Sequence, residues 1–263
     1  MLTAPSYLPR SPSLCLVGYA VENATPVRPG LAEEPVQALP KRLVGSLKKE
    51  FVIGVAASRY HSCVYTADSL FTWGKNNGQL GYPALATPIQ HTPRKVTALT
   101  QPVKQMCATE VATVCLLEGG DVSVLHRDTH FKVTFPTSRF PSAMQVYRPP
   151  NVSARPTIFK VAGSGTTFIA LSDMGDVFSW QLENPSFETS AGPSSSRDIK
   201  TYRIWEDRKT FTAVADAAVA NDTIVIATRS GHVFVRNKKK ELSTIKGVRI
   251  EGQQWRTSSQ WKC

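Results

Sequence analysis

The stretch GVAASRYHSCVYTADSLFTWGKNNGQLG, from Gly54 to Gly81, decides the fold of this chain. Two short apolar runs are joined by the polar turn TADS, and a Gly-Gln-Leu-Gly turn ends the stretch. Short apolar runs bounded by turn-forming residues are typical of β-strands, and two such runs with a short loop predict a hairpin. Asp can hydrogen-bond to its own backbone and Gly accepts positive φ, so both suit the turns.

The front half of this stretch recurs three times downstream. Counted from Val55, the equivalent positions follow at steps of 51, 55 and 56 residues: Met106, Val161 and Ala217. Nine residues further on, each copy has a residue inside a run such as SCVYT, TVCLL, FIALS or TIVIA: Val64, Cys115, Ala170 and Ile226. A turn and a second apolar run follow in every copy. Imperfect hairpins at a period near fifty residues predict an array of small sheets.

The pattern resembles the regulator of chromosome condensation repeat, which implies a seven-bladed β-propeller. The resemblance rests on Val55-Ala56-Ala57, His61, the run Leu70–Gly74 and the turn Gly78–Gly81. More narrowly, RYHSC followed by DSLFTWGKNNGQLGY resembles the propeller region of inhibitor of Bruton tyrosine kinase-like BTB proteins. The later copies are degenerate, because none keeps the Gly-Gln-Leu-Gly turn.

The predicted fold is all-β, a partial propeller of about four antiparallel four-stranded blades behind a disordered N-terminal leader. A complete propeller at about fifty residues a blade needs roughly 350 residues, and this chain has 263, so we expect a piece of a longer protein. The segment PKRLVGSL, which precedes the first repeat as PRKVTAL precedes the second, predicts the end of a preceding blade. The expected divisions are a Pro-rich leader (1–39), that blade end (40–50), the best repeat (51–102), a degenerate blade (103–157), a degenerate blade with a Ser/Gly/Pro loop (158–213), and an incomplete blade with a basic tail (214–263).

The residues of the repeat motif are expected to have structural roles. His61 is expected to be hydrogen-bonded inside a blade, with Tyr60 and Ser62 as candidate partners, and Trp73 to pack between blades. The glycines of the motif are expected to meet backbone requirements rather than to contact a ligand. The structural repeat positions are His61, Trp73, Gly74, Gly78, Gln79, Leu80, Gly81 and Trp180.

Catalytic patterns are not found in the sequence. His126-Arg127-Asp128 copies the start of a kinase catalytic loop, but Val133 stands where the asparagine is required and no other kinase motif accompanies it. His126 and His130 have the spacing of a helical metal pair, yet the flanking FKVTF favours a strand and no third ligand is evident. We therefore expect no enzyme activity, no catalytic residues, no cofactor and no metal.

The cysteines indicate the redox environment of the protein, and the hydropathy bears on membrane insertion. Five cysteines are scattered without a CxxC pair, and Cys63 and Cys115 lie in predicted strands, which favours free thiols in a reducing compartment. The sequence has no run of eighteen apolar residues, so no membrane-spanning helix is predicted. The expected location is cytoplasmic or nuclear.

The net charge of +11 is concentrated at the end of the chain. Between Arg229 and Cys263 there are nine basic residues against two glutamates, and Lys238, Lys239 and Lys240 follow the fourth hairpin directly. A basic cluster attracts phosphate backbone or an acidic protein surface. A solvated turn that protects a sheet edge is the simpler interpretation of the three lysines, since Lys is common there.

The functional hypothesis is a non-catalytic scaffold that binds other proteins, with no membrane and no small-molecule substrate. The narrower resemblance implies a longer protein with ankyrin repeats and BTB domains, acting as an adaptor for a cullin-based ubiquitin ligase or as a regulator of a kinase. Two alternatives stay open. One is a guanine-nucleotide exchange factor for a small GTPase, as the founding family member is, and the other is a chromatin-associated propeller that binds nucleic acid through its basic tail.

Overall fold

The computed structural model describes residues 15–16, 41–42, 46–47, 49–139, 153–183, 199–206, 214–237 and 242–244. The regular elements of these residues are all β-strands. No helix in this part of the chain is long and apolar enough to cross a membrane. Most of the predicted leader, the Ser/Gly/Pro-rich loop and the three consecutive lysines lie outside the described residues.

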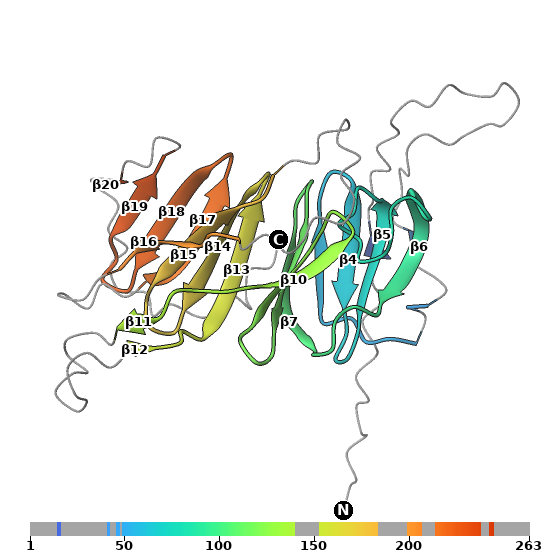
Figure 1. Cartoon of the computed structure of the whole chain (residues 1–263), viewed down its shortest axis with the longest axis horizontal. Coiled ribbons are helices and arrows are strands. Elements are labelled where there is room, and N and C mark those ends of the chain that lie inside the picture. The colour runs from blue at the N-terminus through green and yellow to red at the C-terminus, as the bar shows by residue number, and fades with distance from the viewer. Residues whose placement is uncertain are drawn as a thin grey trace, which may run out of the picture.

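Four antiparallel sheets of four strands follow one another along the chain, and we number them blades 1 to 4 (Figure 1). Blade 1 contains β3 (Gly54–Ala57), β4 (His61–Tyr65), β5 (Leu70–Lys75) and β6 (Ile89–Val96). Blade 2 contains β7 (Val103–Ala108), β8 (Thr113–Leu117), β9 (Val122–His126) and β10 (Thr129–Val133). Blade 3 contains β13 (Ile158–Ser164), β14 (Thr167–Ser172), β15 (Val177–Gln181) and β16 (Tyr202–Trp205). Blade 4 contains β17 (Val214–Ala220), β18 (Thr223–Thr228), β19 (Val233–Arg236) and β20 (Leu242–Thr244). The predicted all-β fold of about four antiparallel blades is confirmed.

Two short strand pairs lie outside the blades. Strands β11 (Ser138–Arg139) and β12 (Ser153–Ala154) pair between blades 2 and 3. Strands β1 (Cys15–Leu16) and β2 (Lys41–Arg42) pair ahead of blade 1. Strand β1 falls within the predicted leader and β2 within the predicted end of a preceding blade, so the leader supplies at least one strand to regular structure.

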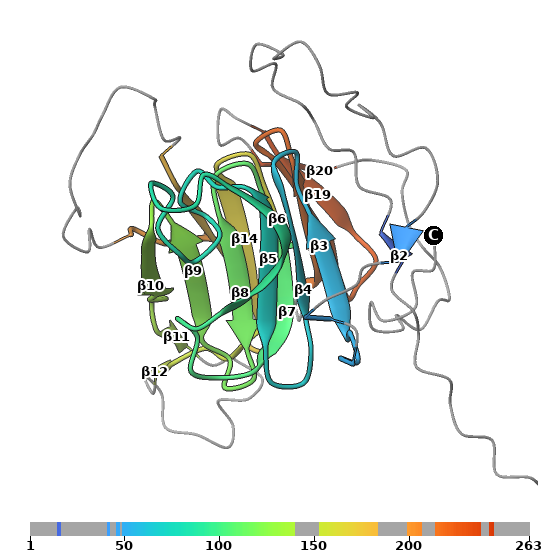
Figure 2. The ribbon, with the colours of Figure 1, turned by 90° about the vertical axis from the view of Figure 1, so that its right-hand side faces the viewer.

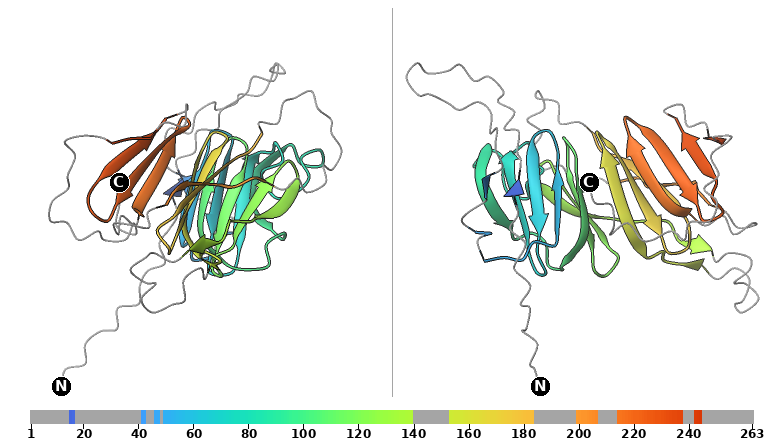
Figure 3. Two further views of the ribbon diagram at one scale, coloured as in Figure 1. Left: turned by 60° about the vertical axis from the view of Figure 1, so that its left-hand side comes forward. Right: turned by 180° about the vertical axis from the view of Figure 1, so that it is seen from behind.

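The blades stack in chain order, with the first strand of each blade against the first strand of the next. Strand β3 packs on β7, β7 on β13, and β13 on β17. The same succession of sheets is visible from two further sides in Figure 3. Because side chains alternate across a strand, each blade has an upstream face toward the preceding blade and a downstream face toward the following one. These two names are kept below.

The hydrophobic core lies between the blades rather than within one of them. Cys63 and Leu70 of blade 1 pack on Met106 and Cys115 of blade 2, and all four side chains are buried. The contact between blades 2 and 3 is the largest cluster and includes Val114, Leu116, Phe168, Phe178 and Trp180. Blades 3 and 4 meet through Ile169, Leu171, Ala217 and Ile226. Each blade therefore depends on its neighbours for the burial of its apolar faces.

Candidate functional site

The Gly-Gln-Leu-Gly turn lies at the contact between blades 1 and 2. Gly78 and Gly81 have φ angles of 91° and 84°, a region that favours glycine. A Cβ atom on Gly78 would lie 2.6 Å from the Cα of Arg127 and 2.6 Å from the backbone nitrogen of Asp128. The glycine is thus required both by the turn and by the close approach of the next blade.

The residues that Gly78 approaches form the turn between β9 and β10. Arg127 and Asp128 have φ angles of 50° and 58°, as in the two-residue turns of tight hairpins. The backbone N–H of Asp128 donates to the carbonyl oxygen of Gly78 at 2.9 Å, and the N–H of Ala84 donates to the Asp128 carboxylate at 2.9 Å. The His-Arg-Asp tripeptide is therefore part of a turn that fastens blade 2 to blade 1.

A buried hydrogen-bond network joins the same two blades through His61. The Thr113 hydroxyl donates to the carbonyl oxygen of Gln79 at 2.9 Å and lies 2.7 Å from Nε2 of His61. Nδ1 of His61 lies 2.8 Å from the Ser58 hydroxyl. Since the Thr113 proton is directed at Gln79, Nε2 of His61 carries its own proton and donates to Thr113, and Nδ1 accepts from Ser58. A neutral imidazole, protonated at Nε2, can therefore form both hydrogen bonds, to Thr113 and from Ser58.

Two expectations for this network are corrected by the structure. The ring of His61 has Ser58 and Thr113 as close partners and Nε2 of Gln79 at 3.4 Å from Nδ1, and not Tyr60 and Ser62. Ser62 follows His61 directly in β4, so its side chain points to the opposite face of the sheet. The Tyr60 ring instead lies beneath two cations, with Lys75 Nζ at 5.4 Å and the Arg59 guanidinium at 5.5 Å from its centroid.

Stability is expected to fall in acid because of His61. Burial lowers the pKa of His61 from 6.5 to about 3. Below pH 6.5 the unfolded chain binds a proton that the folded chain binds only near pH 3, so protonation favours unfolding across this window. The stabilising contribution is complete above pH 6.5 and is lost as the pH falls toward 3.

Urea denaturation of the wild type and of His61→Gln at a series of pH values measures this effect. The midpoint of the wild type should fall more steeply between pH 6.5 and 3 than that of the variant. Burial also lowers the pKa of His126 and His130, and the variant retains both, so only the difference between the two curves reports His61. Parallel curves would contradict the buried neutral histidine.

The two tryptophans at the same repeat position lie in different surroundings. Trp73 ends the apolar run of β5, as Trp180 does in β15, and both are on upstream faces. Trp180 is buried between blades 2 and 3, 5.6 Å from the ring of Phe168. Trp73 packs against the buried cluster of Leu47, Val64 and Phe71, in which Leu47 belongs to the predicted end of a preceding blade (40–50), and it is only partly buried. The packing of Trp73 between two blades remains a prediction.

The histidine pair and the cysteines have structural surroundings. His126 and His130 lie on neighbouring strands, where Nδ1 of His126 is 2.8 Å from the Val111 carbonyl oxygen and Nε2 of His130 is 2.5 Å from the Ser123 hydroxyl. No group of three or more His, Cys, Asp or Glu in the described part of the chain is placed to hold a metal ion. Among the residues whose side chains the structure describes, three thiols are free, and burial raises the pKa of each of them: Cys63, Cys107 and Cys115.

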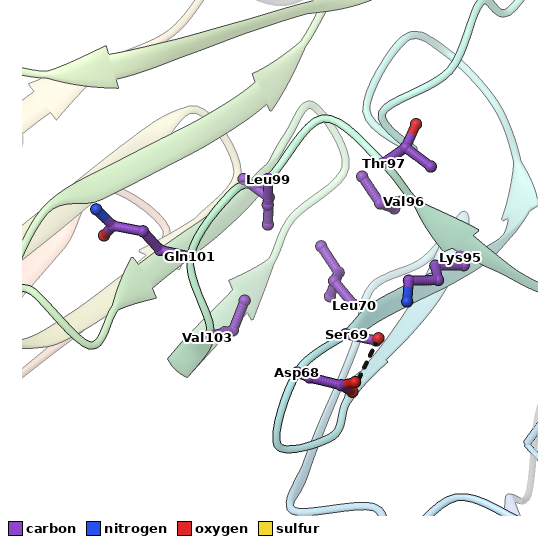
Figure 4. Close-up of a pocket in the computed structure, with 9 residues that line it drawn as sticks. All are labelled: Asp68, Ser69, Leu70, Lys95, Val96, Thr97, Leu99, Gln101 and Val103. Carbon is purple, nitrogen blue, oxygen red and sulfur yellow. Dashed lines mark hydrogen bonds between the residues drawn. The ribbon is translucent and has the colours of Figure 1, made fainter.

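A small cavity of about 270 Å³ lies where the β4–β5 turn meets the connection from blade 1 to blade 2 (Figure 4). Asp68 and Lys95 contribute its charged groups. The hydroxyls of Ser69 and Thr66 donate to the Asp68 carboxylate at 2.9 and 3.0 Å and lower its pKa. These bonds lie within the β4–β5 turn, so the carboxylate holds the geometry of the turn.

The loop from Pro83 to Pro88 is the most exposed apolar feature of the described residues. Leu85 is 99% exposed and Ile89, just beyond the loop, is 54% exposed. The loop is nevertheless anchored, because the N–H of Asn76 donates to Pro88 at 2.8 Å and Ala84 is bonded to the Asp128 carboxylate. Sequence reasoning did not identify this loop, since nothing in the pattern of residues 82–89 distinguishes an exposed leucine from a buried one.

Comparison with known proteins supports the predicted resemblance. BTB/POZ domain-containing protein 1 of Schizosaccharomyces pombe is 28% identical over 218 residues, which are 81% of this chain and 16% of that protein. Inhibitor of Bruton tyrosine kinase from Xenopus laevis is 29% identical over 215 residues, 77% of this chain and 15% of that protein. The human protein of that name is 27% identical over 203 residues, 72% of this chain and 13% of that protein. These proteins are homologues, and the chain spans only about a sixth of their length. No protein-family model matches the chain.

Solved structures show the same fold. Human WBSCR16 superimposes with a TM-score of 0.55 and 19% identity, covering 75% of this chain and 50% of that one. Yeast RCC1 (Prp20), solved with Kap60 bound, superimposes with a TM-score of 0.53 and 13% identity, covering 76% of this chain and 46% of that one. Both are propellers of the regulator of chromosome condensation type. The predicted propeller fold and the resemblance to BTB proteins of the Bruton tyrosine kinase inhibitor group are confirmed.

Proposed function

We propose that this chain is the propeller portion of a larger regulatory protein and acts as a non-catalytic scaffold for other proteins. One observation carries the proposal. The polar residues of the repeat motif are bonded within the fold: His61 contacts Thr113 of the next blade through its ring, and Gln79 accepts from Thr113 through its backbone carbonyl while its side chain bonds to Lys75 and Asn77. Partners are therefore expected to bind the loops and rims of the propeller, where the binding residues of rigid scaffolds usually lie.

The anchored loop around Leu85 is the protein-binding element that we propose. An exposed leucine on a loop fixed at both ends loses little conformational freedom when it enters a pocket on a partner. Apolar anchors of this kind often carry much of the binding free energy at an interface. Arg94, whose guanidinium lies 4.4 Å from the centroid of the Tyr82 ring, places a positive charge beside the loop.

The homologues suggest the kind of partner. Their names refer to a BTB/POZ domain and to inhibition of Bruton tyrosine kinase. An adaptor for a cullin-based ubiquitin ligase, or a regulator of a kinase, in the cytoplasm or the nucleus, is the role that we propose for the longer protein. The propeller would then supply one binding surface of that adaptor.

Affinity capture followed by reconstitution tests the scaffold. We expect at least one captured protein to bind the purified chain saturably in calorimetry, and its affinity to drop about tenfold with Leu85→Asp. Tyr202→Asp is the matched control, because Tyr202 is 60% exposed on the outer strand β16 and lies in another blade. Release of labelled GDP from a Ran-type GTPase is measured in parallel. Catalysed release, with no captured protein that reconstitutes, would contradict the scaffold and favour the exchange-factor alternative.

A further inference from the structure

The outer strand of blade 1 contains a threonine in the sequence context of a phosphorylation site. Thr92 is followed directly by Pro93, and Lys95 is the third residue after it. A kinase recognises such a segment when its substrate groove has a hollow for the proline ring and a carboxylate for the basic side chain. Sequence context alone is common by chance, so the surroundings of Thr92 in the fold decide whether a kinase can reach it.

Strand β6, which carries Thr92, is the outer strand of its sheet. The strand order in blade 1 is β3-β4-β5-β6, and β6 pairs with β5 on one side. Figure 2 shows β6 beside β5, on the side of the blade away from β3. Pro93 has no backbone N–H and therefore cannot donate to a neighbouring strand. An edge strand is the part of a sheet that another protein can approach most directly.

The pairing of β6 with β5 is interrupted at Thr92. Arg94 is paired with Thr72 and Gln90 with Gly74, so three residues of β6, centred on Thr92, lie opposite a single residue of β5. The extra residues of a bulge are left out of the hydrogen-bonded ladder. Movement of this segment into a kinase groove therefore breaks fewer backbone hydrogen bonds than it would in a regular strand.

The hydroxyl of Thr92 is accessible and is held only loosely. Thr92 is exposed, and its hydroxyl oxygen accepts from Nε2 of Gln90 at 3.2 Å. This contact uses the oxygen as an acceptor, so the hydroxyl proton is available for transfer. The Ser46 hydroxyl donates to the carbonyl oxygen of Pro93 at 2.5 Å and fixes the strand just beyond the threonine.

Thr87 provides an internal comparison five residues earlier in the chain. It also precedes a proline, but the third residue after it is Gln90 and not a basic residue. The backbone N–H of Thr87 donates to the carbonyl oxygens of Pro83 and Ala84 at 3.2 Å each, which places Thr87 in a turn. A kinase binds the residues around its acceptor in an extended form. Thr92, in a strand, fits this requirement and Thr87 does not.

We propose that Thr92 is phosphorylated by a proline-directed serine/threonine kinase, and that the phosphate weakens the binding of a partner to the loop around Leu85. Oγ of Thr92 attacks the γ-phosphorus of MgATP. The new O–P bond forms as the bond from this phosphorus to the bridging oxygen of ADP breaks, ADP leaves, and the hydroxyl proton passes to a carboxylate base of the kinase. The product carries a charge of about −2 at neutral pH.

The phosphate lies close to the surface that we propose for partners. Thr92 is three residues after Ile89, which is at most about 10 Å along an extended strand. Ile89 is 54% exposed and directly follows the loop that carries Leu85. The added negative charge raises the cost of removing this surface from water and offsets the positive charge of Arg94. The effect on binding rests on the proposed function, whereas the modification of Thr92 does not.

A kinase assay on the full chain tests the modification. The chain is incubated with MgATP and a purified cyclin-dependent kinase, and mass spectrometry locates the phosphate. We expect about one phosphate per chain at Thr92 and at least about ten times less at Thr87. The rate at Thr92 should fall about tenfold in Lys95→Ala. Thr25 has the same sequence context but lies outside the described residues, so its occupancy is counted separately.

A synthetic peptide of residues 87–97 sets the rate of the same motif without the fold. Thr92 in the chain should be phosphorylated within about tenfold of the rate in the peptide, because the edge strand and its bulge leave it accessible. A slower rate in the chain would show that β6 protects Thr92 and would overturn the proposal. Equal occupancy of Thr87 and Thr92 would overturn it as well.

Calorimetry with a captured partner tests the effect on binding. The phosphorylated chain and Thr92→Glu should bind about tenfold more weakly than the wild type, whereas Thr92→Ala should bind like the wild type. Circular dichroism should show the same strand content in every variant. Unchanged affinity after phosphorylation would refute the switch. If no captured protein binds the unmodified chain, the scaffold and the switch both fail, and the kinase assay still decides the modification of Thr92.

Discussion

Replacement of Gly78 by alanine is expected to lower the free energy of unfolding by about 3 kcal/mol. The φ of 91° is unfavourable for any residue with a Cβ, and that atom would lie 2.6 Å from backbone atoms of Arg127 and Asp128. Backbone cannot rotate away as a side chain can, so blade 2 must move from blade 1. The loss is measured by urea denaturation at equilibrium.

Gly165→Ala is the matched control for this prediction. Gly165 also has a positive φ, 55°, but a Cβ there meets nothing within 4 Å. The substitution should therefore cost only the strain of left-handed backbone, about 1 kcal/mol. Equal losses for the two variants would mean that the close approach of the β9–β10 turn contributes nothing to stability.

Replacement of Trp180 by alanine is expected to cost about 4 kcal/mol. The side chain is 1% exposed, its ring stacks on that of Phe168, and the ring of Phe135 lies 5.9 Å from it in a T-shaped arrangement. Its removal leaves a large cavity between blades 2 and 3. Nε1 of Trp180 has no hydrogen-bond partner, so Trp180→Phe should cost much less than the alanine variant.

Trp73→Ala tests the same repeat position without a covering blade. Trp73 is only partly buried, and the loss should be about 2 kcal/mol. A loss as large as that of Trp180→Ala would show that Trp73 is covered in solution.

Much of the fold could be predicted from the sequence because the repeat is periodic. The four positions from Val55 to Ala217 each lie in the first strand of a blade, and the positions nine residues later, such as Val64, pair directly with them. Periodicity places these residues on one face without any knowledge of the neighbouring blade. A fourth strand was expected in blade 3 after the Ser/Gly/Pro loop, but the residues of β16 were not assigned because a long connection separates them from β15.

The contacts between blades could not be predicted in the same way. Thr113 and Asp128 bond to blade 1, and Asp222 accepts from Thr167 at 2.5 Å between blades 3 and 4. The partners in such pairs are more than thirty residues apart, and one Asp or Thr in a turn looks like any other. Sequence neighbours of His61 were expected to bond to it for the same reason, whereas the fold brings in a residue of the next blade.

The surface that we propose for partners could not be identified from the sequence. The motif residues contact one another and the neighbouring blade, whereas the exposed apolar loop around Leu85 has no signature in the repeat pattern. Lys238, Lys239 and Lys240 lie outside the described residues, so their role as a basic contact remains a prediction.

A double-mutant cycle between His61 and Thr113 tests the central claim most directly, which is that neighbouring repeats are fastened to each other by buried contacts. The free energy of unfolding is measured for the wild type, His61→Ala, Thr113→Val and the double variant. The two residues belong to different blades and their side chains are 2.7 Å apart, so a coupling free energy of about 1–2 kcal/mol is expected. Losses that add within about 0.3 kcal/mol would show that the two residues do not interact, and the stacked arrangement of blades 1 and 2 would be contradicted.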